Sequence, residues 1–255
     1  MSGRLAGKVA VVVGGSKGIG LGVAQRFAEE GARVVIIARG RQGLERALAQ
    51  ARPDDAAGGA ISAVQADMTE LAQIDRAYAD VRAQVGRIDV LVAGLGGPQR
   101  APLGAITEAH VDAVFRLNVT APLFCVQQAL PLMTAGASVI LLSSTAAARG
   151  VAALSVYGAA KAALRQLARG WMVDLQPRRI RVNVLTPGPT DTPGLAAMAA
   201  PGQAPRMLAQ FAARNPSGRV ARGQDVANAA LFLASDEAAF INGAELAVDG
   251  GVTQV

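Results

Sequence analysis

A glycine-rich run near the N-terminus, Gly14-Gly15-Ser16-Lys17-Gly18-Ile19-Gly20, constrains the fold more than any other stretch. It follows a short β-branched apolar segment, Lys8 to Val13, and precedes an amphipathic segment from about Leu21 to Glu30. A second apolar segment, Val34 to Ala38, comes next. These patterns predict a buried strand, a helix and another buried strand in a right-handed βαβ unit. Glycines let the backbone turn tightly and let a pyrophosphate reach the helix N-terminus, so the unit predicts a dinucleotide site.

The end of the second strand indicates which dinucleotide binds. An acidic residue at this place binds a ribose 2′-hydroxyl, whereas an arginine accommodates a 2′-phosphate. The sequence here is Ala38-Arg39, without a carboxylate, and Lys17 adds a second positive charge from the glycine run. Two cations and no acid favour NADP(H) over NAD(H); the alternative is that both are surface charges without a ligand.

The composition suits one large α/β domain spanning residues 1–255 and excludes several classes of protein. No apolar run reaches the roughly 18–20 residues that span a bilayer, and Met1 to Gly7 lacks the apolar core of a signal peptide. The single cysteine, Cys125, lies in an apolar stretch, which predicts a buried thiol in a reducing compartment, hence the cytoplasm. The single histidine, His110, excludes a histidine-based metal cluster and is expected in the first turn of a helix.

The net charge of +6 raises the question of nucleic-acid binding. The basic residues are scattered singly among alanine and leucine rather than gathered into a stripe with aromatic residues. The densest group, Arg178-Arg179-Ile180-Arg181, precedes a strand at the end opposite the expected site and is interpreted as a solvated edge. We therefore expect neither a nucleic-acid nor a membrane partner, although the charge can favour anionic ligands.

The rest of the chain continues the alternation of strands and helices. After a polar link from Pro53 to Gly59, further strands are expected at Ala60–Gln65, Ile88–Val92, Val139–Leu142, Arg181–Leu185 and Glu245–Val248. Helices are expected at about Glu70–Val85, Thr107–Met133 (bent or interrupted, given Pro122 and Pro131), from near Tyr157 to Gln176, and at Gln224–Ala234. The segment of about 190–222 is rich in Ala, Pro, Gly and Met, follows a strand, and is interpreted as a mobile lid over a ligand.

Three polar residues in the second half form a candidate catalytic set. Tyr157 and Lys161 are four residues apart in a helical run, so both leave the same face. An ammonium about 4–5 Å from the phenol, at an effective dielectric of about 20, favours the phenolate by roughly 3–4 kcal/mol. This would bring the phenol pKa from near 10 to roughly 7–8, where proton transfer is most useful. Ser144 lies thirteen residues before Tyr157, at the end of a strand.

With Asn118 in a polar break of a long helix and Pro187-Gly188 after a strand, the chain resembles the short-chain dehydrogenase/reductase family, NADP-preferring type. The motifs Gly14-x-x-x-Gly18-x-Gly20, Asp67, Asn118, Ser144 and Tyr157-x-x-x-Lys161 occur in the family's order and cover essentially the whole chain. The resemblance implies a Rossmann-like, doubly wound α/β fold with a seven-stranded parallel sheet in the order 3-2-1-4-5-6-7 and helices on both faces. It also implies a homo-oligomer, usually a tetramer, in the cytoplasm.

The resemblance also implies residue roles. Tyr157 would exchange a proton with the substrate oxygen, Ser144 would hydrogen-bond that oxygen, Lys161 would bind the nicotinamide ribose, and Asn118 would hold a water. The expected NADP(H) contacts come from the carboxyl ends of several strands: Gly14, Ser16, Lys17, Gly18, Ile19, Gly20, Arg39, Asp67, Met68, Ala93, Gly94, Tyr157, Lys161, Pro187, Gly188, Thr190 and Thr192. Asp67 and Met68 would meet the adenine, and the residues from Pro187 onward the nicotinamide side.

Two positions depart from the family pattern. Val13 stands where the family usually has threonine, and Ala93-Gly94-Leu95-Gly96 replaces an Asn-Asn-Ala-Gly-like stretch. The lost amides would be replaced by backbone or water contacts, or local order would fall, and Leu95 would place a bulkier side chain near the cofactor. The favoured interpretation is an enzyme that interconverts a small-molecule ketone, apolar or aromatic, with a secondary alcohol. A 3-oxoacyl-thioester reductase, with Arg149 meeting an anionic group, and a non-catalytic NADP(H)-binding sensor are the alternatives.

Overall fold

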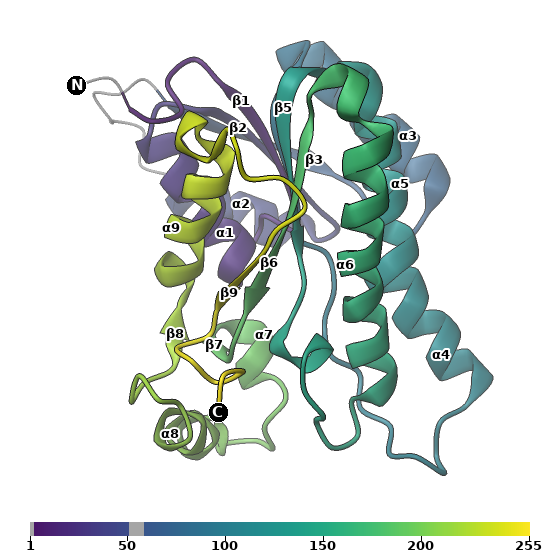
Figure 1. The fold of residues 1–255 in the computed structure, drawn as a ribbon, viewed down its shortest axis with the longest axis vertical. Helices are drawn as coiled ribbons and strands as arrows, with labels where there is room; N and C mark the ends of the chain where they lie inside the picture. Colours follow the sequence, from purple (N-terminus) through teal and green to yellow (C-terminus); the bar gives the residue numbers. More distant parts are fainter. Residues whose placement is uncertain (1–2, 51–58) are drawn as a thin grey trace.

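The computed structural model describes residues 3–50 and 59–255, so all but the last residue of the expected link from Pro53 to Gly59 lies outside the described residues. Seven parallel strands form one sheet in the order β3-β2-β1-β4-β5-β6-β9, which confirms the predicted doubly wound topology (Figure 1). The strands are β1 Val9–Val13, β2 Arg33–Ala38, β3 Ala60–Gln65, β4 Ile88–Ala93, β5 Met133–Leu142, β6 Arg181–Pro187 and β9 Glu245–Val248.

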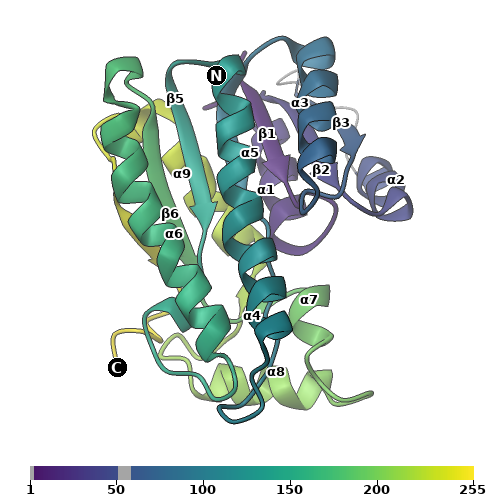
Figure 2. The same ribbon diagram turned by 90° about the vertical axis from the view of Figure 1, so that its right-hand side faces the viewer.

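Helices cover both faces of the sheet, and alternate strand residues supply two cores. Val11 and Val13 point into the core under α3, α5 and α6, whereas Ala10 and Val12 point into the core under α1, α2 and α9. Figure 2 shows α3, α5 and α6 in front of the sheet. The helices are α1 Gly18–Glu29, α2 Arg41–Gln50, α3 Leu71–Val85, α4 Glu108–Phe115, α5 Ala121–Ala129, α6 Ser155–Asp174, α7 Pro193–Ala196, α8 Ala204–Ala213 and α9 Gly223–Ala234.

The long helical stretch expected from Thr107 to Met133 is divided into separate pieces. A π-helical turn, η1 (Arg116–Thr120), separates α4 from α5, and a 3₁₀ turn at Leu130–Leu132 ends the stretch. The interruption therefore comes before Pro122, which lies in the first turn of α5 and is well tolerated there. His110 lies in the first turn of α4, as expected, and its backbone N–H donates to the Thr107 hydroxyl.

The expectation that Arg178 to Arg181 form a solvated edge is wrong for two of the three arginines. Arg181 is buried, and its guanidinium donates to the carbonyl oxygens of Leu233 (2.8 Å) and Ile241 (3.3 Å). Arg178 donates to the carbonyl oxygen of Leu130 at 2.9 Å. Leu233 lies in the last turn of α9, where carbonyl groups lack intrahelical partners. These two guanidinium groups thus donate hydrogen bonds to backbone carbonyl groups of neighbouring elements. The pattern of charges in the sequence does not reveal this role.

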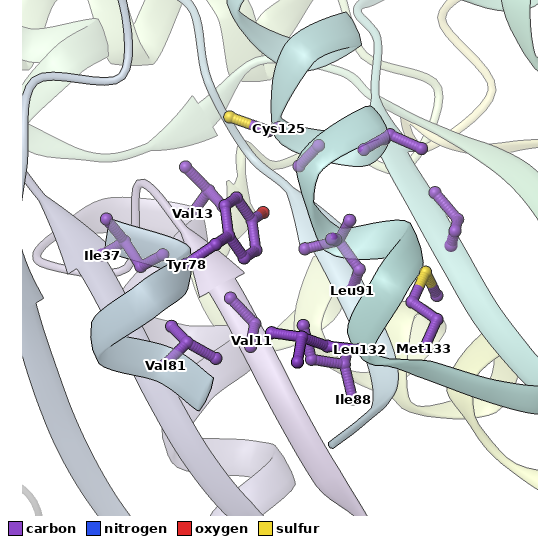
Figure 3. Packing of buried hydrophobic residues seen from close by; sticks show 14 of the residues in the cluster. Val11, Val13, Ile37, Tyr78, Val81, Ile88, Leu91, Cys125, Leu132 and Met133 are labelled. Carbon is purple, nitrogen blue, oxygen red and sulfur yellow. The ribbon is translucent and has the colours of Figure 1, made fainter. Parts of the chain in front are cut away.

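The core under α3 and α5 contains a buried tyrosine beside the buried cysteine (Figure 3). Cys125 is fully buried, as expected, and burial raises the pKa of its thiol. The hydroxyl of Tyr78 is also buried and has no hydrogen-bond partner within residues 3–50 and 59–255. Burial raises the pKa of Tyr78 well above its ordinary value, so this phenol stays neutral in the core.

Removing that hydroxyl should stabilise the protein. A buried, unpartnered hydroxyl costs roughly 1–3 kcal/mol, whereas the ring of phenylalanine retains the apolar contacts. We expect Tyr78→Phe to raise the free energy of unfolding by about 1 kcal/mol, as measured by urea denaturation followed by circular dichroism. A decrease of similar size would show instead that the hydroxyl makes a stabilising hydrogen bond.

Candidate active site

The tyrosine and the serine of the candidate set are brought together by a close approach of α6 to the turn after β5. Gly158 lies against this turn, Thr145–Ala147, and a Cβ at Gly158 would be 2.5 Å from the carbonyl oxygen of Ala146. Only glycine permits this approach. Tyr157, one residue earlier, is buried, and a hydrogen bond with Ser144 acts on its pKa. The serine hydroxyl also accepts from the backbone N–H of Ala146 at 3.2 Å.

Lys161 is fixed by backbone carbonyl groups one helical turn further along α6. Its side chain is 3% exposed, and Nζ donates to the carbonyl oxygens of Leu95 (3.0 Å) and Leu142 (2.9 Å). Nζ lies 5.9 Å from the centre of the Tyr157 ring. The hydroxyl of Ser143 donates to the carbonyl oxygen of Lys161 at 3.0 Å and ties α6 to the end of β5. The lysine therefore has a defined position beside the tyrosine.

Burial reverses the expected effect of this pair on the tyrosine. The sequence predicts a Tyr157 pKa of roughly 7–8 beside a charged lysine. In the structure, burial raises the pKa of Tyr157 above its ordinary value, although the hydrogen bond with Ser144 lowers it in part. Burial also lowers the pKa of Lys161 to about 7. Burial thus disfavours the charged form of both groups.

Asn118 reaches the same place from the π-helical turn η1. It is fully buried, its Nδ2 donates to the carbonyl oxygen of Val114 (2.9 Å), and its Oδ1 accepts from the backbone N–H of Gly97 (3.2 Å). Such π turns are rare and often lie at functional sites. Here the turn carries an amide side chain toward the backbone that follows β4.

Gly96 marks the point where Asn118 and Lys161 meet. Its φ of +128° is a conformation that residues with a side chain rarely adopt, and a Cβ there would collide with Asn118 Oδ1 and come within 2.6 Å of Lys161 Nζ. The carbonyl oxygen of Leu95 thus accepts from Lys161, and the backbone N–H of Gly97 donates to Asn118. The half-buried side chain of Leu95 packs against the core. Gly96 was not predicted as a site residue; its position in a stretch with three glycines after β4 was the available signal.

The glycine turn between β1 and α1 brings backbone groups so close together that side chains would not fit. Gly14 has φ +81°, and a Cβ there would lie 2.6 Å from the carbonyl oxygen of Gly94. A Cβ at Gly20 would collide with the carbonyl oxygen of Gly14. No side chain of the described residues caps the first turn of α1, whose N-cap is Lys17. The free N–H groups at the start of α1 and the glycine turn, which has few side chains, fit a pyrophosphate. Ser16 and Ile19 are half-buried in the same turn.

The expected adenosine residues follow β2 and β3. Arg39 and Lys17 are exposed, and Arg39 Nη1 lies 3.5 Å from Asp67 Oδ2. Burial opposes ionisation of Asp67, but hydrogen bonds from Thr69 and the charge of Arg39 outweigh it and lower the pKa of this carboxyl. The side chain of Met68 is buried in the core under α3 and α5.

The expected nicotinamide residues lie at the carboxyl ends of β4 and β6. Ala93 ends β4, and the N–H of Gly94 donates to the carbonyl oxygen of Val13 at 3.0 Å. Pro187 ends β6, the Thr190 hydroxyl donates to the carbonyl oxygen of Gly188 at 3.0 Å, and Thr192 caps α7. Gly18, in the glycine turn, approaches Thr192 so closely that a Cβ would lie 3.3 Å from its side chain. The structure thus groups these residues at the sheet edge where nucleotides bind in open α/β folds.

The segment of about 190–222 lies beyond β6 and contains α7 and α8 (Figure 1). Two short strands, β7 (Thr190–Asp191) and β8 (Ala221–Arg222), pair and join its two ends, a contact that the sequence analysis did not predict. The apolar side chains of the segment are half-buried rather than enclosed: Leu195, Met198, Met207, Leu208 and Phe211.

Two further findings concern metals and membranes. Across residues 3–50 and 59–255, no group of three or more His, Cys, Asp or Glu side chains is arranged to hold a metal ion. None of the helices in this part of the chain is both long and apolar enough to cross a membrane.

Comparison with known proteins places this geometry in a family. Residues 13–253 match the family model described as Enoyl-(Acyl carrier protein) reductase. The chain is 42% identical over 254 residues to the oxidoreductase asL5 of Sarocladium schorii, covering 99% of this chain and 98% of that protein. It is 39% identical over 260 residues, with full coverage of both, to cis-4-hydroxycyclohexanecarboxylate dehydrogenase of Sinomonas cyclohexanicum.

Solved structures agree with this match. The fold is similar to a short-chain dehydrogenase/reductase from Serratia marcescens BCRC 10948, with a TM-score of 0.89, 32% identity, and coverage of 98% of this chain and 99% of that one. The chain belongs to the short-chain dehydrogenase/reductase family. The resemblance stated from the motifs is thereby confirmed, and the protein is an oxidoreductase of a family that binds a nicotinamide cofactor. Another structural relative, a blue fluorescent protein from a metagenomic library, is a complex with NADPH (TM-score 0.87, 33% identity, coverage 98% and 99%).

Proposed function

We propose that this protein is an NADP(H)-dependent oxidoreductase that interconverts a ketone and a secondary alcohol. The observation that carries the proposal is the convergence of Tyr157, Ser144, Lys161 and Asn118 from α6, the end of β5 and η1. All four lie beside the glycine-rich backbone that suits a dinucleotide. A sensor without catalytic function would not need this arrangement of buried polar side chains.

Each residue of the set has a chemical task in this proposal. NADPH supplies the hydride when it is bound. Tyr157 donates its proton to the substrate oxygen during ketone reduction and accepts it again during alcohol oxidation. Ser144, beside it, orients that oxygen by a hydrogen bond. Lys161 and Asn118 are held by the backbone of residues 95–97 and provide polar groups next to the tyrosine.

In this proposal, the pKa of Tyr157 reaches a useful value only in the complex with the cofactor. Burial keeps the Tyr157 pKa high and the Lys161 pKa near 7 in the structure described above. A ribose hydroxyl and a phosphate beside Lys161 would favour its charged form, since hydrogen bonding and negative charge both stabilise an ammonium. The charged lysine would then lower the phenol pKa, so that proton transfer becomes effective when the cofactor binds.

The preference for NADP(H) rests on charge at the end of β2. Arg39 and Lys17 are exposed cations beside the glycine turn, and the residue after Ala38 is not a carboxylate. This is the arrangement that accommodates a 2′-phosphate. One structural relative, the blue fluorescent protein, binds NADPH and supports this assignment by similarity.

A cyclic, largely apolar substrate suits the proposed lid of residues 190–222. Its half-buried side chains, including Met207, Leu208 and Phe211, are apolar. By its name, the relative from Sinomonas cyclohexanicum acts on an alcohol attached to a six-membered carbon ring that also bears a carboxylate. The matched family model is described by an enoyl-(acyl carrier protein) reductase, whose name points to carrier-bound thioesters. For a protein that reduces ketones, the second candidate is therefore a 3-oxoacyl thioester.

We also propose a homo-oligomer, a tetramer by resemblance to the family, that works in the cytoplasm. Val173 on α6 and Phe240 before β9 are apolar side chains that are strongly exposed in one chain. The single, buried cysteine suits a reducing compartment.

Turnover of a defined panel tests the proposed function. We expect the protein to oxidise NADPH in the presence of substituted cyclohexanones or cyclic diketones, and to use NADH less efficiently at equal concentration. The panel includes a 3-oxoacyl thioester, and absorbance at the wavelength of the reduced nicotinamide is the measurement. Tight NADPH binding without turnover of any carbonyl compound would favour the sensor instead, and equal use of both cofactors would contradict the assigned preference.

A further inference from the structure

Arg39 and Asp67, both expected at the adenosine end of the cofactor, form an ion pair with each other. Ala38 and Gln65 are partners in the parallel register of β2 and β3, so the residues that follow these strands are neighbours. Arg39 Nη1 lies 3.5 Å from Asp67 Oδ2, and the side chains are 80% and 24% exposed. The cation that would bind a 2′-phosphate thus already has an anionic partner.

The carboxylate of this pair is held rigidly. The backbone N–H and the hydroxyl of Thr69 donate to Asp67 Oδ1 at 3.0 and 2.7 Å. The backbone N–H of Asp67 itself donates to Gln73 Oε1 at 3.0 Å. Oδ1 is therefore occupied, and Oδ2 is the oxygen left for Arg39. Since the carboxylate is fixed and the arginine side chain is exposed, the arginine is the partner that can move.

We propose that Asp67 competes with the 2′-phosphate of NADP(H) for Arg39 and thereby limits the preference for NADP(H) over NAD(H). This inference rests on the proposed function, in which Arg39 recognises the phosphate. A phosphate at Arg39 must draw the guanidinium from Asp67 or share it, and it then lies near a fixed negative charge. NAD(H) carries a neutral hydroxyl at that position and leaves the pair intact. Asp67 therefore weakens the binding of NADP(H), which carries the phosphate, and not that of NAD(H), which carries the hydroxyl.

The ratio of the two dissociation constants tests this competition without a substrate. Kd values for NADPH and NADH are measured by nicotinamide fluorescence on the full chain, and the ratio Kd(NADH)/Kd(NADPH) is compared between variants. Any contact of Asp67 with the adenine is common to both cofactors and cancels in the ratio. For an exposed pair we expect Asp67→Asn to raise the ratio about two- to five-fold. The rise should diminish in 0.5 M salt, at about 4–5 Å Debye length.

A matched control separates the ion pair from general charge. Arg41 is also 80% exposed and pairs with Glu45 (Nε–Oε1 2.9 Å), so Glu45→Gln removes one carboxylate from a neighbouring exposed pair. It should change the ratio clearly less than Asp67→Asn. In an Arg39→Gln background, Asp67→Asn should raise the ratio less than in the wild type, because the cation that the two anions share is gone and only the repulsion between the carboxylate and the phosphate is relieved.

The outcomes distinguish this inference from the proposed cofactor preference. If Arg39→Gln lowers the ratio and Asp67→Asn raises it more than Glu45→Gln does, the competition is established. If Arg39→Gln lowers the ratio but Asp67→Asn leaves it unchanged or reduces it, the competition is refuted and the NADP(H) preference stands. If Arg39→Gln leaves the ratio unchanged, Arg39 does not recognise the phosphate, and the competition is refuted together with the part of the cofactor assignment that rests on Arg39.

Discussion

Tyr157→Phe is expected to lower the turnover of any ketone that the wild-type protein reduces by about 10²–10⁴-fold, the usual contribution of a general acid. The substitution removes one oxygen atom, and the ring keeps its contacts in the small cluster with Val114, Leu154 and Ala160. The hydroxyl is the group beside Ser144 that can exchange a proton with a substrate oxygen. The Kd for NADPH should remain within a few-fold of the wild-type value, so the loss of activity should appear in kcat and not in the cofactor Kd.

The chain contains its own matched control for this experiment. It has two tyrosines, and Tyr78→Phe makes the same chemical change in the core under α3 and α5. That variant should retain wild-type turnover, because its hydroxyl lies in an apolar cluster. Near-wild-type turnover of Tyr157→Phe would show that the proton comes from another group and would refute the role assigned to Tyr157.

Local patterns in the sequence were sufficient for most of the fold. β1, β2 and β4 are buried on both faces, so they occur as short apolar runs, and the glycine turn fixes how the first two are connected. α2 was missed although Leu44, Ala47 and Leu48 have helical spacing, because this apolar stripe is short and only Leu44 and Ala47 of the ten residues are buried. β7 and β8 were missed because each has two residues and exists only through pairing with the other.

The sequence was sufficient to predict which residues form the candidate site, but not the directions of their pKa shifts. The spacing of Tyr157 and Lys161 shows that they share a helix face, but it does not show that both side chains are buried. Burial comes from η1, from the end of β5 and from the backbone after β4, which are distant in sequence. Desolvation then sets the direction in which each pKa moves. The π-helical turn that presents Asn118 has no local signature in Leu117-Asn118-Val119 either.

Gly96→Ala is expected to reduce turnover by at least about 100-fold, since displacements near 1 Å at a catalytic group have effects of this size. The new methyl group would collide with Asn118 Oδ1 and lie 2.6 Å from Lys161 Nζ, at a φ of +128° that alanine rarely adopts. Either both side chains move or the backbone after β4 does, and in each case the bonds to Leu95 and Gly97 are disturbed. Strain of about 1–3 kcal/mol should also lower the free energy of unfolding.

The next residue provides the control that separates this collision from a general loss of flexibility. A Cβ at Gly97 would have nothing within 4 Å among the described residues, and alanine keeps the N–H that donates to Asn118. Gly97→Ala should therefore cost far less turnover than Gly96→Ala, although both remove one glycine from the same stretch. Circular dichroism would establish that Gly96→Ala still folds. Equal losses in the two variants would mean that the stretch needs mobility rather than the close approach at Gly96. Near-wild-type turnover of Gly96→Ala would mean that Asn118 and Lys161 need not be held as they are here.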